Sequence, residues 1–223
     1  MTVLPAPVEA VIFDMDGLLL DTERLYREAI VGAAANLGFA FSDAFYQTMI
    51  GVADKECQAM VADHFGPQFP MAQYLGDSSS RLRQLFRVGI PVKPGANELL
   101  AELAHRAIPT ALATSTNRAT AVRQLQDAGL HQYFKVIVTR EEVTRGKPHP
   151  DLFLKAARDV GVSPQGCVVL EDSYHGIRAA HAAGAMPVMV PDLLAATDEV
   201  SRLCVAVVSN LHEARILLQE TLA

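Results

Sequence analysis

Six short apolar runs recur along the 223-residue chain, and they constrain its fold more than any other feature. They are EAVIF (9–13), IPTALA (108–113), KVIVT (135–139), CVVL (167–170), MPVMV (186–190) and CVAVV (204–208). Most are rich in Val, Ile or Leu and lack polar alternation, which is typical of strands covered on both faces. Helical patterns separate the later runs, at 118–128, 151–160 and 174–183, and a last amphipathic helix follows Asn210, its expected cap. This alternation predicts an α/β fold with a doubly wound, parallel-sheet (Rossmann-like) core.

Residues 22–90 break this rhythm, because they carry helical patterns without a convincing buried strand. The segment GIPVKPG (89–95), with two prolines and two glycines, is typical of a linker that returns the chain to the sheet. We therefore predict a Rossmann-like catalytic core made of residues 1–21 and 91–223. A small α-helical cap domain, residues 22–90, is inserted after the first strand. The alternative is one domain with extra helices.

Charge and composition exclude several partners. The formal net charge is -6 and no basic cluster is present, whereas surfaces that bind nucleic acid are normally basic. No apolar run approaches the ~20 residues that a membrane-spanning helix needs. The N-terminal residues lack the pattern of a signal peptide, and three widely spaced cysteines form no disulfide framework. We expect a cytoplasmic protein that binds neither nucleic acid nor membrane and is a monomer.

Polar residues gather where the apolar runs end. The first run ends in Asp14 and Asp16, the second in Thr114, Ser115, Thr116 and Asn117, and the fourth in Glu171 and Asp172, while Lys147 follows the third. Ligands of open α/β sheets bind beyond the carboxyl ends of the strands, so these groups should meet in one cluster. That cluster would hold four carboxylates, one ammonium group and one hydroxyl group.

Four crowded carboxylates beside one lysine cannot all ionise unless a cation joins them. Oxygen ligands and partial hydration suit Mg2+, which binds through one or two carboxylates and a phosphate. A carboxylate held on Mg2+ and facing a phosphate is a plausible nucleophile, which would give an aspartyl-phosphate intermediate. The lysine and the threonine hydroxyl would then stabilise the transferring phosphoryl oxygens.

Four ordered motifs carry a resemblance to a known family. They are FDMDGLLLDTE, ALATST, GKPHPDLF and VLEDSYHGIRAAHAAGAMPVMV. They resemble the motifs of the haloacid dehalogenase-like hydrolase superfamily, in its phosphatase and β-phosphoglucomutase branch with a helical cap. The stretches FDMDGLLLDTERLY and MVPD are most similar to those of pseudouridine-5'-phosphatases and of sugar-phosphate phosphatases.

The resemblance assigns roles to the core residues. It implies that Asp14 is the nucleophile and that Asp16 is the general acid that protonates the leaving oxygen and then activates water. It also implies Mg2+ ligands: the Asp14 carboxylate, the backbone carbonyl of Asp16, Asp172, and Glu171 through a water. Phosphate oxygens would be held by the Thr114 hydroxyl, the Ser115 amide and Lys147.

Substrate specificity should depend on the cap, where the sequence is less informative. Tyr26, Lys55 and Asn117 are the candidate substrate contacts, although Asn117, with Thr116, also fits a cap of the following helix. Tyr26 stands where several sugar-phosphate mutases resembling this chain carry a histidine, which disfavours mutase activity.

These observations predict an enzyme, a Mg2+-dependent phosphatase that hydrolyses a small phosphomonoester through an aspartyl-phosphate. The partner would be a small phosphorylated metabolite, either a sugar phosphate or a nucleotide-like monophosphate. One alternative is a β-phosphoglucomutase-like phosphomutase. Another, from a different class, is a phospho-accepting signalling domain, which would be about half as long and would lack a helical insertion.

Overall fold

The computed structural model describes residues 4–50, 52 and 54–221, and within that part of the chain six parallel strands form one sheet. The strands are β1 (Ala10–Phe13), β2 (Thr110–Thr114), β3 (Val136–Thr139), β4 (Cys167–Glu171), β5 (Met186–Met189) and β6 (Ala206–Val207). Each lies within or closely overlaps one of the six apolar runs, so the predicted strands are confirmed.

The strand order is β3-β2-β1-β4-β5-β6, so the direction of winding reverses at β1. The chain first builds β2 and β3 on one side of β1 and then crosses to place β4, β5 and β6 on the other. Val11 of β1 accordingly pairs with Thr110 on one side and Val168 on the other. In such sheets a crevice opens beyond the carboxyl ends of the strands at the point of reversal. The doubly wound, Rossmann-like α/β fold is therefore confirmed.

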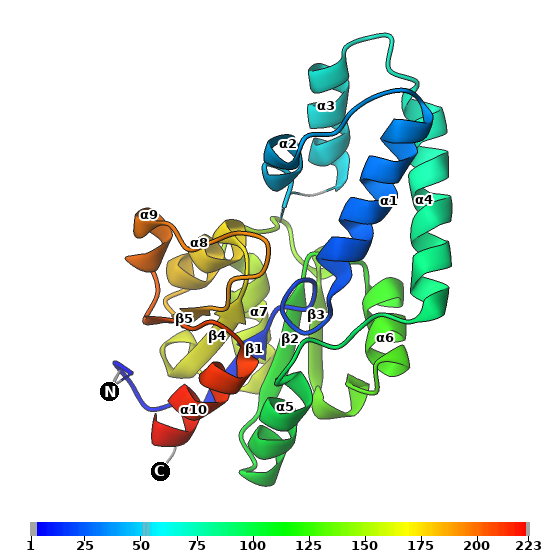
Figure 1. The fold of residues 1–223 in the computed structure, drawn as a ribbon. Helices are drawn as coiled ribbons and strands as arrows, with labels where there is room; N and C mark the ends of the chain where they lie inside the picture. The colour runs from blue at the N-terminus through cyan, green and yellow to red at the C-terminus, as the bar shows by residue number, and fades with distance from the viewer. Residues whose placement is uncertain (1–3, 51, 53, 222–223) are drawn as a thin grey trace.

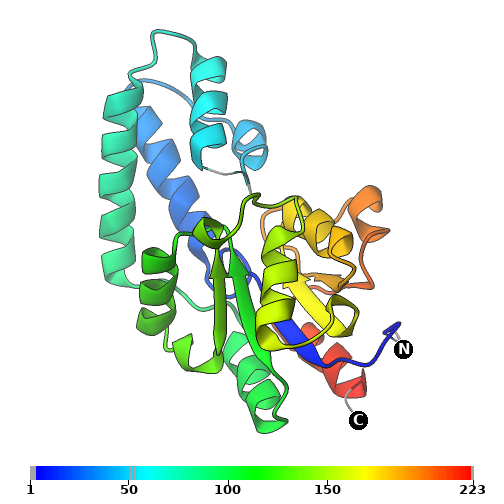
Figure 2. The same ribbon diagram turned by 180° about the vertical axis from the view of Figure 1, so that it is seen from behind.

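Alternate residues of β1 enter hydrophobic clusters on opposite faces of the sheet, as the two-residue period of a strand requires. Val11 and Phe13 pack with leucines of α5 (Ala96–His105) and α10 (Leu211–Thr221). Ala10 and Ile12 pack with α7 (Asp151–Val160) and α8 (Tyr174–Ala182). Figure 1 shows α5 and α10 in front of the sheet, and Figure 2 shows α7 covering it from behind.

The helices of the core agree with the sequence in most places. Residues 118–128, 151–160 and 174–183 contain α6 (Arg118–Asp127), α7 and α8, and the side chain of Asn210 caps α10 by accepting from the Glu213 amide (3.0 Å). The helix α5 was not predicted, nor were α9 (Asp198–Ser201) and the 3-10 turns η1 (His131–Tyr133), η2 (Arg140–Glu142) and η3 (Pro164–Gly166). Across the described residues, every helix is too short or too polar to cross a membrane.

The segment between β1 and α5 forms a helical cap. It contains α1 (Thr22–Asn36), α2 (Asp43–Gln47), α3 (Asp54–Phe65) and α4 (Met71–Val88). Figure 1 shows these helices above the carboxyl ends of the strands. They share a hydrophobic cluster of their own, the cap cluster, which includes Ala33, Tyr46, Val61 and Phe69. The division into domains at residues 21 and 90 stays a prediction.

Replacement of Gly95 tests how closely α5 approaches α10. The residue has φ +89°, and a Cβ there would lie 2.6 Å from the backbone nitrogen of His212. Gly38 has a similar φ of +81°, yet a Cβ would meet no atom within 4 Å. We expect Gly38→Ala to lower the free energy of unfolding by about 1 kcal/mol through backbone strain alone. Gly95→Ala should cost a further ~1 to 3 kcal/mol, because a backbone must shift. Urea unfolding of both variants measures the difference, and equal losses would contradict the close approach.

Candidate active site

Three acidic side chains meet at the point where the winding of the sheet reverses. Asp14 directly follows β1, and its backbone N–H donates to the carbonyl of Leu170 in β4 (3.1 Å). Glu171 ends β4 and Asp172 follows it, so the pairing of β1 with β4 brings all three acids together. One carboxylate oxygen of each lies within 4.8 Å of the others, and the three residues are at most 6% exposed. The predicted meeting of strand ends therefore occurs.

Lys147 inserts its ammonium group between two of these acids. It comes from the loop before α7, and its Nζ donates to Asp14 Oδ1 (2.5 Å) and Glu171 Oε1 (2.6 Å). The ring of Phe153, on the first turns of α7, lies beneath it, with its centroid 5.1 Å from Nζ. Burial alone would lower the pKa of Lys147, but the charges of Asp14 and Glu171 outweigh burial and raise it. Lys147 is thus a permanent buried cation.

One ammonium group does not neutralise this cluster. Burial, with the charges of Glu171 and Asp16, raises the pKa of Asp14 to about 8 even though Lys147 opposes the shift. Burial and the neighbouring carboxylates also raise the pKa of Asp172 well above its ordinary value. A bound divalent cation would remove this penalty, and carboxylate oxygens in a buried cluster are the ligands that Mg2+ prefers. The donor set therefore fits Mg2+.

Asp16 points to a different set of partners. Its Oδ1 accepts from the Thr22 hydroxyl (2.8 Å) and its Oδ2 from the Thr116 hydroxyl (2.7 Å). Burial raises the pKa of Asp16, and these two hydroxyl groups act in the opposite direction. The expectation that Thr116 caps the following helix is wrong, because Asn117 alone occupies the cap position and Thr116 binds Asp16.

Gly17 allows the first motif to pass close to Asp172. Its φ is +80°, and a Cβ at this position would lie 2.3 Å from Asp172 Oδ2. Any side chain would collide with a carboxylate that the cluster needs, so glycine is required here for both space and conformation.

Glu23 is a cap residue beside the cluster that the sequence did not single out. It accepts from the hydroxyl of Tyr46 in α2 (3.1 Å), and that hydroxyl also donates to the Glu23 carbonyl (3.1 Å). Burial, together with the charge of Asp16, raises the pKa of Glu23 to about 7. The position of Glu23 was a usable signal, because it directly follows Thr22, the first residue of α1, which begins only six residues after Asp16.

The remaining core residues are placed at different depths. Thr114 is fully buried at the end of β2, and its hydroxyl accepts from the Thr116 amide (3.0 Å). Ser115 follows it and is exposed. Asn117 is also exposed, and its side chain accepts from the Thr120 amide (3.0 Å) as the cap of α6. Contact of Ser115 or Asn117 with a ligand stays a prediction.

The two cap candidates lie on different helices. Tyr26 of α1 packs edge to face on Phe86 of α4, with ring centroids 5.9 Å apart, which gives it a role inside the cap. Lys55 is exposed near the start of α3. A substrate contact for either residue stays a prediction.

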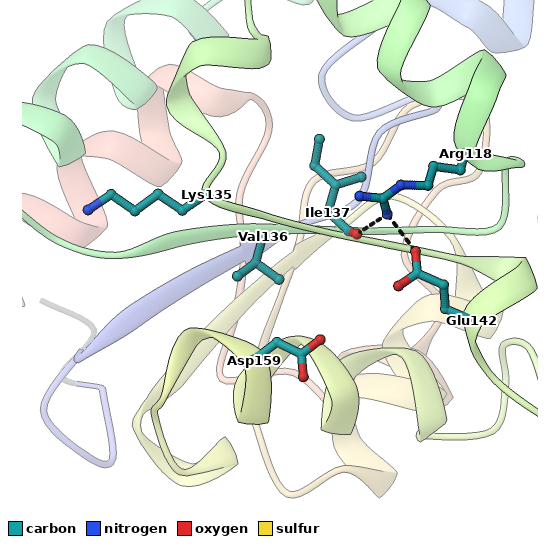
Figure 3. A pocket seen from close by; sticks show the side chains of 6 residues that line it. All are labelled: Arg118, Lys135, Val136, Ile137, Glu142 and Asp159. Atoms are coloured by element: carbon teal, nitrogen blue, oxygen red, sulfur yellow. Dashed lines mark hydrogen bonds and ion pairs between the residues drawn. The ribbon is translucent and has the colours of Figure 1, made fainter.

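A separate hollow of about 360 Å³ lies beside β3, one of the two edge strands of the sheet. It is lined by Arg118, Lys135, Val136, Ile137, Glu142 and Asp159, none of which is a predicted site residue. Figure 3 shows Arg118 reaching over the strand, where it donates to the carbonyl of Ile137 (2.9 Å) and to Glu142 (2.7 Å). This arginine occupies a backbone acceptor of the open edge, which protects such edges from pairing with other chains.

Comparison with known proteins agrees with this geometry. The family model described as haloacid dehalogenase-like hydrolase matches residues 11–190. The phosphorylated carbohydrates phosphatase of Thermotoga maritima is 33% identical over 177 residues, covering 79% of this chain and 82% of that protein. A Drosophila melanogaster protein named "Probable pseudouridine-5'-phosphatase" is 35% identical over 187 residues, covering 81% and 80%. The crystal structure of CbbY from Rhodobacter sphaeroides, in complex with phosphate, matches with a TM-score of 0.75 and 27% identity, covering 92% of this chain and 96% of that chain.

Metal binding can be read from stability. If Asp14 and Asp172 hold Mg2+, the metal should stabilise the folded protein by about 2.7 kcal/mol at ~100 times its dissociation constant. Asp172→Asn should remove most of that gain, whereas Asp127→Asn, on the exposed end of α6, should keep it. Thermal unfolding with and without Mg2+ measures the effect. An undiminished gain in Asp172→Asn would show that the cluster is not the metal site.

Glu23 gives a pH dependence with a defined sign. Its pKa is raised from 4.5 to about 7 in the folded state, so its ionised form destabilises the fold at high pH. Glu23→Gln should therefore raise the free energy of unfolding by about 1 to 3 kcal/mol near pH 8, and by much less near pH 4.5. Glu28→Gln, at an exposed position of the same helix, should change little at either pH. Urea unfolding in EDTA tests this, and a gain that does not grow with pH would count against it.

Proposed function

The chain belongs to the haloacid dehalogenase-like hydrolase family, and we propose that it is a Mg2+-dependent phosphatase acting on a small phosphomonoester. The observation that carries this proposal is the buried cluster in which Lys147 contacts Asp14 beside Asp172. A carboxylate next to a fixed ammonium group and a metal-binding acid is suited to attack a phosphate. The ammonium group, and a Mg2+ ion held by that acid, would offset the negative charge of the phosphate.

The first half of the proposed reaction forms a phosphoaspartate. A carboxylate oxygen of Asp14 attacks the phosphorus, and the bond from phosphorus to the ester oxygen breaks. The electron pair of that bond stays on the leaving oxygen, which takes a proton from Asp16. Lys147, held by Glu171, remains beside Asp14 to balance the charge of the phosphoryl oxygens.

The second half returns the enzyme to its starting state. Asp16, now ionised, accepts a proton from a water molecule as that water attacks the phosphorus. The bond between phosphorus and Asp14 breaks, which releases inorganic phosphate. Burial raises the pKa of Asp16, which favours the protonated form that the first step needs.

The metal would be held by Asp14 and Asp172, with Glu171 acting through water and the backbone carbonyl of Asp16 completing the set. A bound Mg2+ supplies the positive charge that allows these acids to ionise together and that polarises the phosphoryl group. Both oxygens of Glu171 already accept protein hydrogen bonds, from Lys147 and from Ser173, which supports an indirect role for this residue.

The proposed substrates are sugar phosphates and nucleotide-like monophosphates. Two relatives carry names that state a phosphorylated carbohydrate or pseudouridine 5'-phosphate as substrate, and both align over about four fifths of this chain. Hydrolysis is preferred to phosphoryl transfer between sugar hydroxyls, because Tyr26 stands where several resembling mutases carry a histidine. The Tyr26 ring instead packs against Phe86 within the cap.

Phosphate release from a panel of monoesters tests the proposal. The panel contains hexose phosphates, nucleoside monophosphates and pseudouridine 5'-phosphate. We expect turnover with Mg2+, none in EDTA, and a loss of at least ~1000-fold in kcat for Asp14→Asn. The matched variant Asp127→Asn, at an exposed site, should keep full activity. Full activity of Asp14→Asn would contradict the assignment of Asp14 as the nucleophile. Interconversion of hexose phosphates without phosphate release would favour the mutase alternative.

A further inference from the structure

Two linker segments join the cap to the core, and their backbones are hydrogen-bonded to each other. The outgoing linker (19–21) leads into α1, and the return linker (91–93) follows α4. Two backbone hydrogen bonds of 2.9 Å hold them together, from Asp21 to Pro91 and from Lys93 to Leu19. Because the two linkers are hydrogen-bonded to each other, a contact that holds one of them also constrains the other.

Lys93 ties this unit to the core through buried charge. Its Nζ lies 2.6 Å from Asp192 Oδ1 and 3.8 Å from Asp21 Oδ1. The Asp192 side chain is only 5% exposed, and its Oδ2 is buried without a hydrogen-bond partner among the described residues. Asp21 Oδ1 is likewise buried and accepts no hydrogen bond there, although Arg24 Nε approaches to 3.5 Å. Lys93 thus provides a shared counter-charge for two carboxylates, that of Asp21 in the outgoing linker and that of Asp192 in the core.

Asp192 belongs to the 190–197 loop, which leaves the carboxyl end of β5 and touches both the site and the cap. The backbone of Val190 donates to the carbonyl of Glu171 (2.8 Å), and the hydroxyl of Tyr174 donates to the carbonyl of Ala195 (2.6 Å). From this anchored loop, Leu193 and Leu194 pack against the cap cluster. The stretch MVPD, which is part of the resemblance described from the sequence, ends at Asp192.

Asp21, one of the two carboxylates near Lys93, is adjacent in sequence to a residue that hydrogen-bonds to the proposed general acid. Asp21 is followed directly by Thr22, whose hydroxyl donates to Asp16 Oδ1. We propose that Lys93 and Asp192 are positioning residues that hold the outgoing linker against the core and thereby orient the Asp16 carboxyl group for proton transfer. This inference rests on the proposed phosphatase activity, with Asp16 as its acid.

The chemistry of the leaving group separates this role from a general effect on folding. An alkyl phosphate, such as a sugar phosphate, needs a proton on its leaving oxygen, whereas p-nitrophenyl phosphate loses a stable anion and needs none. A misplaced Asp16 should therefore impair the alkyl ester selectively. The ratio kcat/KM covers steps through the first phosphoryl transfer, so it reports the acid step without the later hydrolysis of the phosphoaspartate.

The experiment compares Lys93→Met and Asp192→Asn with the wild type on both esters. For each variant we expect kcat/KM for the alkyl ester to fall at least ~10-fold more than for the aryl ester, because general acids contribute ~100-fold or more. Lys93→Arg keeps the charge and should restore most of the alkyl activity. Asp16→Asn provides the benchmark, with a larger selective loss in the same direction.

The matched control is Lys155→Met. Lys155 lies on α7 at the same 2.6 Å from Asp159, and its side chain is 22% exposed against 20% for Lys93. Removing this ion pair should leave the ratio of the two activities unchanged. Thermal unfolding of all variants identifies any that fail to fold, and Asp192→Asn, which keeps the shape of the side chain, then decides the question.

The two proposals fail in different ways. Equal losses on both esters for Lys93→Met and Asp192→Asn, or no loss at all, would overturn the positioning role while the phosphatase stands. If the folded wild type releases phosphate from neither ester with Mg2+, both proposals fall. A selective loss of the alkyl activity that Lys93→Arg reverses supports the inference.

Discussion

The rest of the structure depends on the burial of several like charges at one point of the sheet. One carboxylate oxygen each of Asp14, Glu171 and Asp172 lies within 4.8 Å of the others, and all three residues are almost fully buried. Removing ionised groups from water costs several kcal/mol each unless opposite charge is close. Lys147 supplies one such charge, and the pKa values of Asp14 and Asp172 are raised because one is too few. The buried acidic cluster therefore fits a metal cation, whose charge would offset that of the carboxylates.

The surrounding elements can be understood as solutions to that constraint. Ser173 caps α8 and at the same time donates from its backbone and side chain to Glu171 Oε2, so the start of this helix supports the acid. Gly176 of α8 lies so close that a Cβ there would be 1.7 Å from Glu171 Oε1, and a Cβ at Gly17 would be 2.3 Å from Asp172 Oδ2. The two glycines therefore leave room for these buried carboxylates beside the backbone.

The sequence predicts the core better than the cap for a physical reason. Strands buried on both faces leave continuous apolar runs, and the polar residue that ends each run marks the ligand-binding edge, so Asp14, Lys147 and Asp172 can be found without a structure. By contrast, α5 follows a proline- and glycine-rich linker whose composition conceals the start of a helix. The hydroxyl of Thr116 meets Asp16 across 100 residues, and Lys93 meets Asp192 across 99. Such pairs depend on which loops and strand ends the tertiary fold brings together, and no local sequence pattern contains that information.

Asp14 and Asp16 are one residue apart, yet the structure fixes them by different means. Asp14 is held by Lys147 and by the backbone of β4, which both belong to the core. Asp16 is held from two sides, by Thr116 from the core and by Thr22 from the first turn of the cap. The orientation of Asp16 therefore depends on the position of the cap, whereas that of Asp14, the proposed nucleophile, does not. In the proposed reaction, proton delivery by Asp16 to the leaving group would therefore require a correctly placed cap, because Thr22 of the cap holds Asp16.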